Sequence, residues 1–342
     1  MNELFFPFLL VLVASIFQGT FGLGMKYVKP LPWEAWWIVY SLVAMVVLPV
    51  AWATFVVPDL CGAIGSVPAA ALQKAALFGF LWGVGGILFG VSVSYVGVSI
   101  TYGIVMGLAA SVGSLIPLAQ MENASSNPAF PWVIGGVAVM LVGVAVCCVA
   151  GVQRDRASAS AGGAMQAEGK SLKTGLTIAI TSGVLSALLN VGFANAAPVA
   201  EAAVKNGALT RNSSLAAWVV VLFGAMLMNA GYAVFLLFKN KSWGGFATAG
   251  AGKAYGWAIL TGVLWFGALG VYGQGAALLG NIGPVIGWPI LLGLSLIVSN
   301  ALGFLTGEWK GAAGPFRLMM AGIAVLIVAC CILGYANRAG AT

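Results

Sequence analysis

Ten long apolar segments restrict this chain to very few folds. Hydrophobic residues make up 61% of its 342 residues and charged residues only 7%, whereas an ordinary soluble domain has about 25% charged residues. A helix needs roughly 20 apolar residues to cross the hydrocarbon core of a bilayer. Segments of that length lie near residues 4–24, 34–57, 73–95, 98–119, 131–150, 174–196, 215–238, 255–279, 283–306 and 316–336. The sequence therefore predicts an all-α integral membrane protein with ten transmembrane helices.

An internal repeat divides these segments into two related halves. Residues 79–97 recur 183 positions later, and a Cys-Cys pair keeps the same offset. The matching positions are Gly79 with Gly262, Leu81 with Leu264, Trp82 with Trp265, Gly90 with Gly273, Gly97 with Gly280 and Cys147 with Cys330. Each half contains five of the ten segments. Because five is an odd number, the second half must enter the membrane in the opposite sense from the first. We expect two inverted five-helix repeats, at residues 1–150 and 174–342, of the kind that hold a transported substrate between them.

The positive residues predict which helix ends face the cytoplasm. Of the 15 Lys and Arg residues, four would share the side of the N-terminus and eleven would lie on the other side. Positive residues stay on the cytoplasmic side, so both termini are expected on the periplasmic side of the inner membrane. The polar stretch at 151–173 is then a flexible cytoplasmic linker between the repeats. No basic stripe interleaved with aromatics accompanies the net charge of +7, so we expect no nucleic-acid partner.

Residue types that most enzyme chemistry needs are missing. The chain has no His, which is the commonest metal ligand and general base, and its five Cys show no C-x-x-C spacing. It has neither a Walker sequence nor a glycine-rich turn opening a soluble βαβ unit. We therefore expect no enzyme activity, no metal and no cofactor, and this chain alone is not an ATP-driven pump.

Polar side chains within the apolar segments are the best candidates for a substrate site. Each costs free energy in lipid unless it faces a cavity or a partner helix. Amide and phenol groups hydrogen-bond to hydroxyls, and an aromatic face covers the C–H face of a sugar, so together they suit a neutral polyhydroxylated ligand. For each amide, a hydrogen bond between helices is the alternative. The candidate substrate-binding residues are Gln18, Trp82, Tyr102, Asn190, Asn195, Asn229, Tyr232, Trp265, Gln274 and Trp288.

Proton coupling usually needs a titratable group, and no carboxylate lies at the centre of a segment. Only Glu34 and Glu201 lie near segment ends that can open to a cavity, so both are candidate proton-coupling residues. The alternative is a carboxylate that pairs with lysine at a helix end. The pairs that the sequence allows are Glu34 with Lys26 or Lys29, and Glu308 with Lys310.

Glycine pairs four residues apart occur in several segments. They are Gly79 with Gly83, Gly86 with Gly90, Gly103 with Gly107 and Gly303 with Gly307. Each pair lines one helix face and lets two helix backbones approach closely. Static packing is the first interpretation, and a smooth face for sliding during transport is the second.

Short stretches along nearly the whole chain carry a family resemblance. They include Trp33-Glu34-Ala35-Trp36-Trp37, Phe78-Gly79-Phe80-Leu81-Trp82, Tyr95-Val96-Gly97-Val98-Ser99, Asn195-Ala196-Ala197-Pro198 and Gly307-Glu308-Trp309. In these stretches the chain resembles the L-rhamnose-proton symporter family of the drug/metabolite transporter superfamily. The resemblance implies ten helices in two inverted repeats, a central cavity lined by helices 1–4 and 6–9, and uptake of a deoxy sugar with a proton.

The function predicted from these features is secondary active transport. We expect import of a monosaccharide, L-rhamnose or a related deoxy sugar, by proton symport with alternating access; the partners are the sugar, the proton and the lipid bilayer. One repeat would rock against the other, with the short turns at 95–99 and 280–284 as gates. The alternatives are a drug/metabolite-type exporter and an uncoupled facilitator of a small polar or amphipathic metabolite. A membrane receptor or scaffold would leave the repeat and the amide-lined segments without a use.

Overall fold

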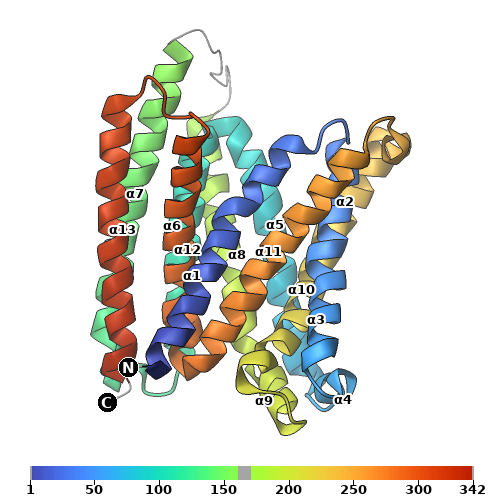
Figure 1. Ribbon diagram of the computed structural model, residues 1–342, viewed down its shortest axis with the longest axis vertical. Helices are drawn as coiled ribbons and strands as arrows, with labels where there is room; N and C mark the ends of the chain where they lie inside the picture. Colours follow the sequence, from blue (N-terminus) through green and yellow to red (C-terminus); the bar gives the residue numbers. More distant parts are fainter. Residues whose placement is uncertain (1, 161–170, 341–342) are drawn as a thin grey trace. The chain divides into compact units, whose positions relative to one another are not determined.

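The computed structural model describes residues 2–160 and 171–340, with the side chains of 5–157 and 171–340, and within these ranges it contains helices and no strands (Figure 1). The long helices are α1 (Asn2–Gly24), α2 (Trp33–Leu42) with α3 (Leu48–Val56), α5 (Ala69–Val96), α6 (Val98–Gln120), α7 (Phe130–Ser160), α8 (Leu172–Asn195), α10 (Thr210–Asn240), α11 (Gly252–Leu278), α12 (Gly283–Leu305) and α13 (Ala313–Gly340). Short helices and turns are η1 (Met25–Tyr27), η2 (Val43–Val47), α4 (Leu60–Gly65), η3 (Ala124–Ser126), α9 (Ala197–Lys205), η4 (Trp243–Ala247) and η5 (Gly280–Ile282). Ten of the described segments are long and apolar enough to cross a bilayer, which confirms the predicted all-α membrane fold.

One span is interrupted by a π-helical turn. The segments α2, η2 and α3 form a single span from Trp33 to Val56, and within it the Leu48 N–H donates to the carbonyl of Val43, five residues back. Pro49 follows at once and has no N–H to donate, so the regular four-residue ladder cannot continue across this point. The proline therefore explains why the span changes its helical pitch here.

The helix α7 continues well past the end of its apolar segment. We expected this helix to end near residue 150, but it runs to Ser160. Its last turns contain Arg, Gln and Ala, which are good helix formers, so the end of hydrophobicity does not end the helix. Residues 151–160 of the predicted flexible linker are therefore helical, and residues 161–170 of that linker lie outside the described residues.

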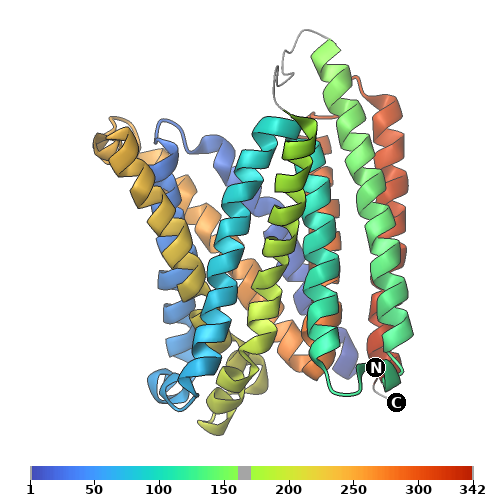
Figure 2. The same cartoon turned by 180° about the vertical axis from the view of Figure 1, so that it is seen from behind.

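The described chain forms two compact units, and each contains segments from both sequence halves. Unit 1 comprises residues 1–83 and 191–283, and unit 2 comprises residues 84–190 and 284–342. In unit 1, α1 packs along α11, while α10 packs against α2, α3, α9 and α11. In unit 2, α7 packs along α13 on one side and α6 on the other, and both views show α7 and α13 side by side (Figures 1 and 2). The helices α5 and α8 contribute to both units.

Glycine brings two helices of unit 1 into backbone contact. A Cβ at Gly79 of α5 would collide with the carbonyl oxygen of Val221 on α10, and a Cβ at Gly224 of α10 would collide with the carbonyl oxygen of Ala76 on α5. Each helix therefore contributes a glycine to this crossing, and both glycines are needed for the close approach. Gly86, further along α5, has the same spacing to a second glycine but meets no atom within 4 Å.

The turn between α5 and α6 consists of a single residue. Gly97 has a φ of 84°, a left-handed conformation that favours glycine. The hydroxyl groups of Ser92 and Thr101, on either side of the turn, lie 3.0 Å apart and tie the two helices together. The predicted short connection at 95–99 is thus confirmed. Gly280, with a φ of 69°, lies at the corresponding turn between α11 and α12.

Candidate functional site

A continuous row of aromatic rings runs through unit 1. Trp33, Trp37 and Tyr40 project from one face of α2 because they are four and three residues apart. The ring centroids of Trp33 and Trp37 are 4.9 Å apart, and those of Trp37 and Tyr40 are 5.0 Å apart. The row continues from Tyr40 to Trp265 on α11 at 6.0 Å, and from Trp265 to Trp82 on α5 at 5.3 Å. We call these five residues the aromatic row.

Three members of the aromatic row, Trp33, Trp37 and Trp82, keep exposed surface. Tyr40 and Trp265 are 2% and 4% exposed, whereas Trp33 is 39% exposed and Trp82 is partly exposed. Trp82 and Trp265, which occupy equivalent positions in the sequence repeat, stack with an angle of 28° between their planes. Trp82 thus stacks on a buried tryptophan and still has surface left for contact.

The amide of Asn229 holds the aromatic row in place. Its Oδ1 accepts a hydrogen bond from the Trp37 indole at 3.2 Å, and its Nδ2 donates to the Ala225 carbonyl at 2.9 Å. Asn229 is buried, and its bond to the Ala225 carbonyl is buried as well. Tyr232, three residues further along α10, packs its edge against Trp33 at 6.1 Å. These two predicted site residues therefore lie beside the row, with Asn229 in a positioning role.

Glu34 is a buried carboxylate whose partners are neutral. It is 6% exposed in the first turn of α2, where the helix N-terminus favours negative charge. Its Oε1 accepts hydrogen bonds from Asn240 Nδ2 at 2.6 Å and from Ser242 Oγ at 3.0 Å. The possible pairing with Lys26 or Lys29 does not form. No cation pairs with this carboxylate among the described residues.

The remaining predicted residues of unit 1 are Gln18, Asn195, Glu201 and Gln274. Gln18 on α1 is partly buried, and its Oε1 is buried with no hydrogen-bond partner among the described residues. Gln274 on α11 is also partly buried. Asn195 at the end of α8 donates to the Val191 carbonyl at 2.8 Å, and Glu201 on α9 is exposed.

Two predicted residues of unit 2 bind helices to one another. The Asn190 amide on α8 donates to the carbonyls of Gly113 at 2.9 Å and Pro284 at 2.8 Å, and it is fully buried. The Trp288 indole on α12 donates to the Ala109 carbonyl on α6 at 3.0 Å. For both residues, this geometry favours the interpretation that the side chain joins two helices over the interpretation that it contacts the substrate.

Tyr102, the last predicted residue, lines a cavity of unit 2. This cavity has a volume of about 250 Å³. Its walls come from α6, α7, α12, α13 and the loop before α13, and the lining residues are Val98, Ser99, Tyr102, Gly103, Met106, Val144, Cys147, Cys148, Gly151, Arg154, Leu296, Ser299, Asn300, Glu308, Trp309 and Met319. The Tyr102 hydroxyl is hydrogen-bonded to the Ser299 side chain.

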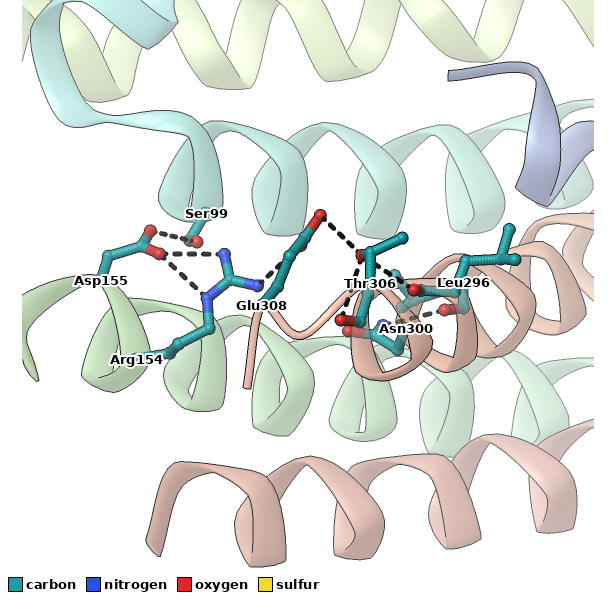
Figure 3. Close-up of polar contacts among 9 residues, drawn as sticks. Ser99, Arg154, Asp155, Leu296, Asn300, Thr306 and Glu308 are labelled. Atoms are coloured by element: carbon teal, nitrogen blue, oxygen red, sulfur yellow. Dashed lines mark hydrogen bonds and ion pairs between the residues drawn. The ribbon is translucent and has the colours of Figure 1, made fainter. Parts of the chain in front are cut away.

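An ionic network at the cavity was not anticipated from the sequence (Figure 3). Arg154 pairs with Asp155 at 2.9 Å and with Glu308 at 3.5 Å, and Ser99 donates to Asp155 at 2.5 Å. Glu308 thus pairs with Arg154 and not with Lys310. No local pattern joins residues that are 154 positions apart, although Glu308 lies in one of the stretches that carry the family resemblance.

Comparison with known proteins shows that the chain is similar to a family of symporters. A family model described as L-rhamnose-proton symport protein matches residues 1–339. Proteins named L-rhamnose-proton symporter from Yersinia pestis and Yersinia pseudotuberculosis are each 28% identical over 94% of this chain and 95% of their own length. A symporter of the same name from Pectobacterium atrosepticum is 29% identical over 97% of this chain and 96% of its own.

Proposed function

Because this chain belongs to the L-rhamnose-proton symport protein family, we propose that it imports L-rhamnose or a related deoxy sugar together with a proton. The family is one of transporters, so this multi-pass membrane protein is not an enzyme. The observation that carries the proposal is that the match extends over the whole chain, from residue 1 to 339. Relatives of nearly equal length are named for sugar and proton.

The proposed sugar contacts are Trp82 and the amides with unused hydrogen-bonding capacity. A tryptophan face covers the C–H face of a sugar ring, and Trp82 stacks on Trp265 with only one of its faces. The Gln18 carbonyl oxygen is buried without a described partner. An unmet buried acceptor costs about 1–3 kcal/mol, so a sugar hydroxyl that donates to it recovers that free energy. Gln274, which makes no described hydrogen bond, is the second amide of this kind.

Glu34 is the proposed proton carrier. Its negative charge faces neutral donors and no described cation, so a transported proton can neutralise a charge that no fixed partner neutralises. Ser242 can turn its hydroxyl to accept a hydrogen bond when the carboxyl is protonated, because a hydroxyl both donates and accepts. Glu201 is exposed on α9 and is the second candidate.

The proposed cycle is alternating access in the inner membrane, with both termini periplasmic. The uneven distribution of Lys and Arg supports this orientation, and the sequence repeat supports inverted halves that exchange inward and outward states. The single-residue turn at Gly97 and the turn at Gly280 are the proposed gates, because glycine there tolerates the backbone changes that gating demands.

Reconstitution into proteoliposomes tests the proposal. Purified protein should accumulate labelled L-rhamnose when the outside is acidic, and only equilibrate it without a pH gradient. Glu34→Gln keeps an acceptor for Asn240 and Ser242 but cannot titrate, so it should retain sugar exchange between the two sides and lose accumulation. Glu201→Gln is the matched control and should accumulate normally.

Each other outcome has a definite meaning. If accumulation is lost in Glu201→Gln and kept in Glu34→Gln, Glu201 is the proton carrier. Equilibration of sugar with no response to pH in the unaltered protein would make the chain an uncoupled facilitator. A protein that moves no monosaccharide in either direction would refute the proposed substrate class.

A further inference from the structure

The cavity of unit 2 is lined by both polar and apolar side chains. Its polar lining includes Tyr102, Ser299, Asn300 and the Arg154 network, which Figure 3 shows around Glu308. Its apolar lining consists of Val98, Met106, Val144, Leu296 and Met319. None of the hydrogen bonds described for the proton or sugar contacts of unit 1 involves this cavity. It is therefore a separate feature that the proposed transport site does not use.

The charges around the cavity disfavour an anionic ligand. Among the lining residues Arg154 is the only cation, and its guanidinium already pairs with Asp155 and Glu308. The guanidinium carbon also lies 5.0 Å from the centre of the Trp309 ring. A phosphate or carboxylate needs a free guanidinium fork for bidentate binding, and this fork is occupied. The two carboxylates also exceed the single cation, which further disfavours an anion.

The cavity has hydrogen-bonding capacity that the protein does not fill. Trp309 is 6% exposed, and its indole N–H has no partner among the described residues. Asn300 uses one N–H for the Leu296 carbonyl at 2.8 Å, and its amide oxygen has no described donor. A buried donor without a partner costs free energy that a ligand acceptor can recover. Hydroxyl groups meet both needs, because each one donates and accepts.

The size of the cavity limits the ligand to a single ring. Its volume of about 250 Å³ lies just below the range of about 300–1,000 Å³ that holds drug-sized molecules. The apolar side chains of the lining suit a methyl group or a C–H face, and the polar ones suit hydroxyls. A neutral monosaccharide that carries a methyl group matches both kinds of lining.

We propose that this cavity is a second sugar site, in which the Trp309 indole N–H and the Asn300 amide bind hydroxyls and the Val144 and Leu296 side chains contact the apolar part of the sugar. The site lies at the end of unit 2 that holds Arg154, an end predicted to face the cytoplasm. The inference rests on the proposed function only in the choice of L-rhamnose as the probe.

Labelling of Cys148 tests this site directly. Cys148 lines the cavity, is partly exposed, and donates to the Ser99 carbonyl at 3.3 Å. In a variant whose other four Cys are replaced by Ala, the rate of alkylation of Cys148 by a small maleimide is measured by mass spectrometry at increasing L-rhamnose. Saturating sugar should slow labelling about tenfold. A second variant that keeps only Cys61, which is exposed in unit 1, should label at an unchanged rate.

Four substitutions separate direct occupancy of the cavity from a conformational effect. Trp309→Phe keeps an aromatic face for Arg154 and removes the N–H, so it should raise the half-protecting sugar concentration about three- to tenfold, as expected for one hydrogen bond. Asn300→Leu should raise it similarly. Trp243→Phe, outside the cavity, should leave it unchanged. In Trp82→Ala, which removes a proposed transport contact, protection of Cys148 should persist.

The outcomes distinguish this inference from the proposed function. Protection that disappears in Trp82→Ala but is unaffected by Trp309→Phe and Asn300→Leu would show a remote conformational response and overturn the second site. Unslowed labelling at concentrations that saturate transport would overturn it as well. Protection without transport would leave the second site standing while the proposed function fails.

Discussion

Alanine at the crossing of α5 and α10 should destabilise the protein, whereas alanine at Gly86 of α5 should not. At Gly79 the new Cβ would collide with the Val221 carbonyl, and at Gly224 it would collide with the Ala76 carbonyl. Both obstacles are backbone atoms, so no side-chain rotation relieves them and the two helices must separate. At Gly86, on the same helix, a Cβ meets no atom within 4 Å.

The size of the effect follows from two opposing contributions. Overpacking a close contact costs about 1–3 kcal/mol, and rigid backbone favours the upper limit. Replacing a helical glycine by alanine stabilises the helix by roughly 0.5–1 kcal/mol. Gly79→Ala and Gly224→Ala should therefore each lose about 2 kcal/mol, which lowers the folded-to-unfolded ratio roughly 30-fold. Gly86→Ala should gain up to about 1 kcal/mol.

Unfolding of the detergent-purified variants, followed by tryptophan fluorescence, measures this difference. The midpoint should fall for Gly79→Ala and Gly224→Ala and stay level or rise for Gly86→Ala. Equal midpoints for Gly79→Ala and Gly86→Ala would refute the reasoning, because the backbone collision would then not change the stability of the protein.

Two further predictions concern the charged end of unit 2 and the orientation in the membrane. Arg154→Gln should destabilise the protein by less than about 1 kcal/mol, since its partners Asp155 and Glu308 are well exposed, and the difference should shrink in high salt; a larger loss in chemical unfolding would contradict a mainly solvated network. An impermeant thiol reagent applied to intact cells should label Ser125→Cys and spare Ala157→Cys, and the reverse pattern would invert the topology.

Hydropathy predicts the spans well because the bilayer imposes a length on each apolar segment. All ten expected segments correspond to described helices. Their ends are harder to predict, since a helix continues as long as its residues favour helix. The extension of α7 to Ser160 shows this difference, because the polar stretch beyond 150 contains Gln, Arg and Ala, which are good helix formers.

Glycine spacing predicts a shared helix face but not the neighbour of that face. Gly79 and Gly86 each belong to a pair with the same four-residue spacing, yet only Gly79 lies against another backbone. The partner is set by tertiary packing, which a single sequence does not contain. The same limit applies to Glu34, whose neutral partners Asn240 and Ser242 lie more than 200 residues away in the chain.

The amides in the spans differ by length in a way that bears on their roles. Asn195, Asn229 and Asn300 each donate to the carbonyl four residues earlier on the same helix. The short asparagine side chain reaches its own backbone, as Ser and Thr do in helices. Glutamine has one methylene more and extends past that carbonyl, and Gln18 keeps its oxygen without a described partner. Side-chain length therefore separates these asparagines, whose N–H groups donate within their own helix, from Gln18, whose amide extends beyond it.

Gln18→Asn tests this argument with the amide group retained. The shorter side chain should turn back to the carbonyl of Ala14, four residues earlier on α1, and withdraw from the sugar. Loss of one hydrogen bond of about 0.5–1.5 kcal/mol should weaken L-rhamnose binding roughly two- to tenfold, while the yield of folded protein stays the same. Asn195→Gln is the matched reverse change. Unaltered sugar affinity in Gln18→Asn would show that the length of this side chain does not decide its role, and Gln18 would then be a contact between helices.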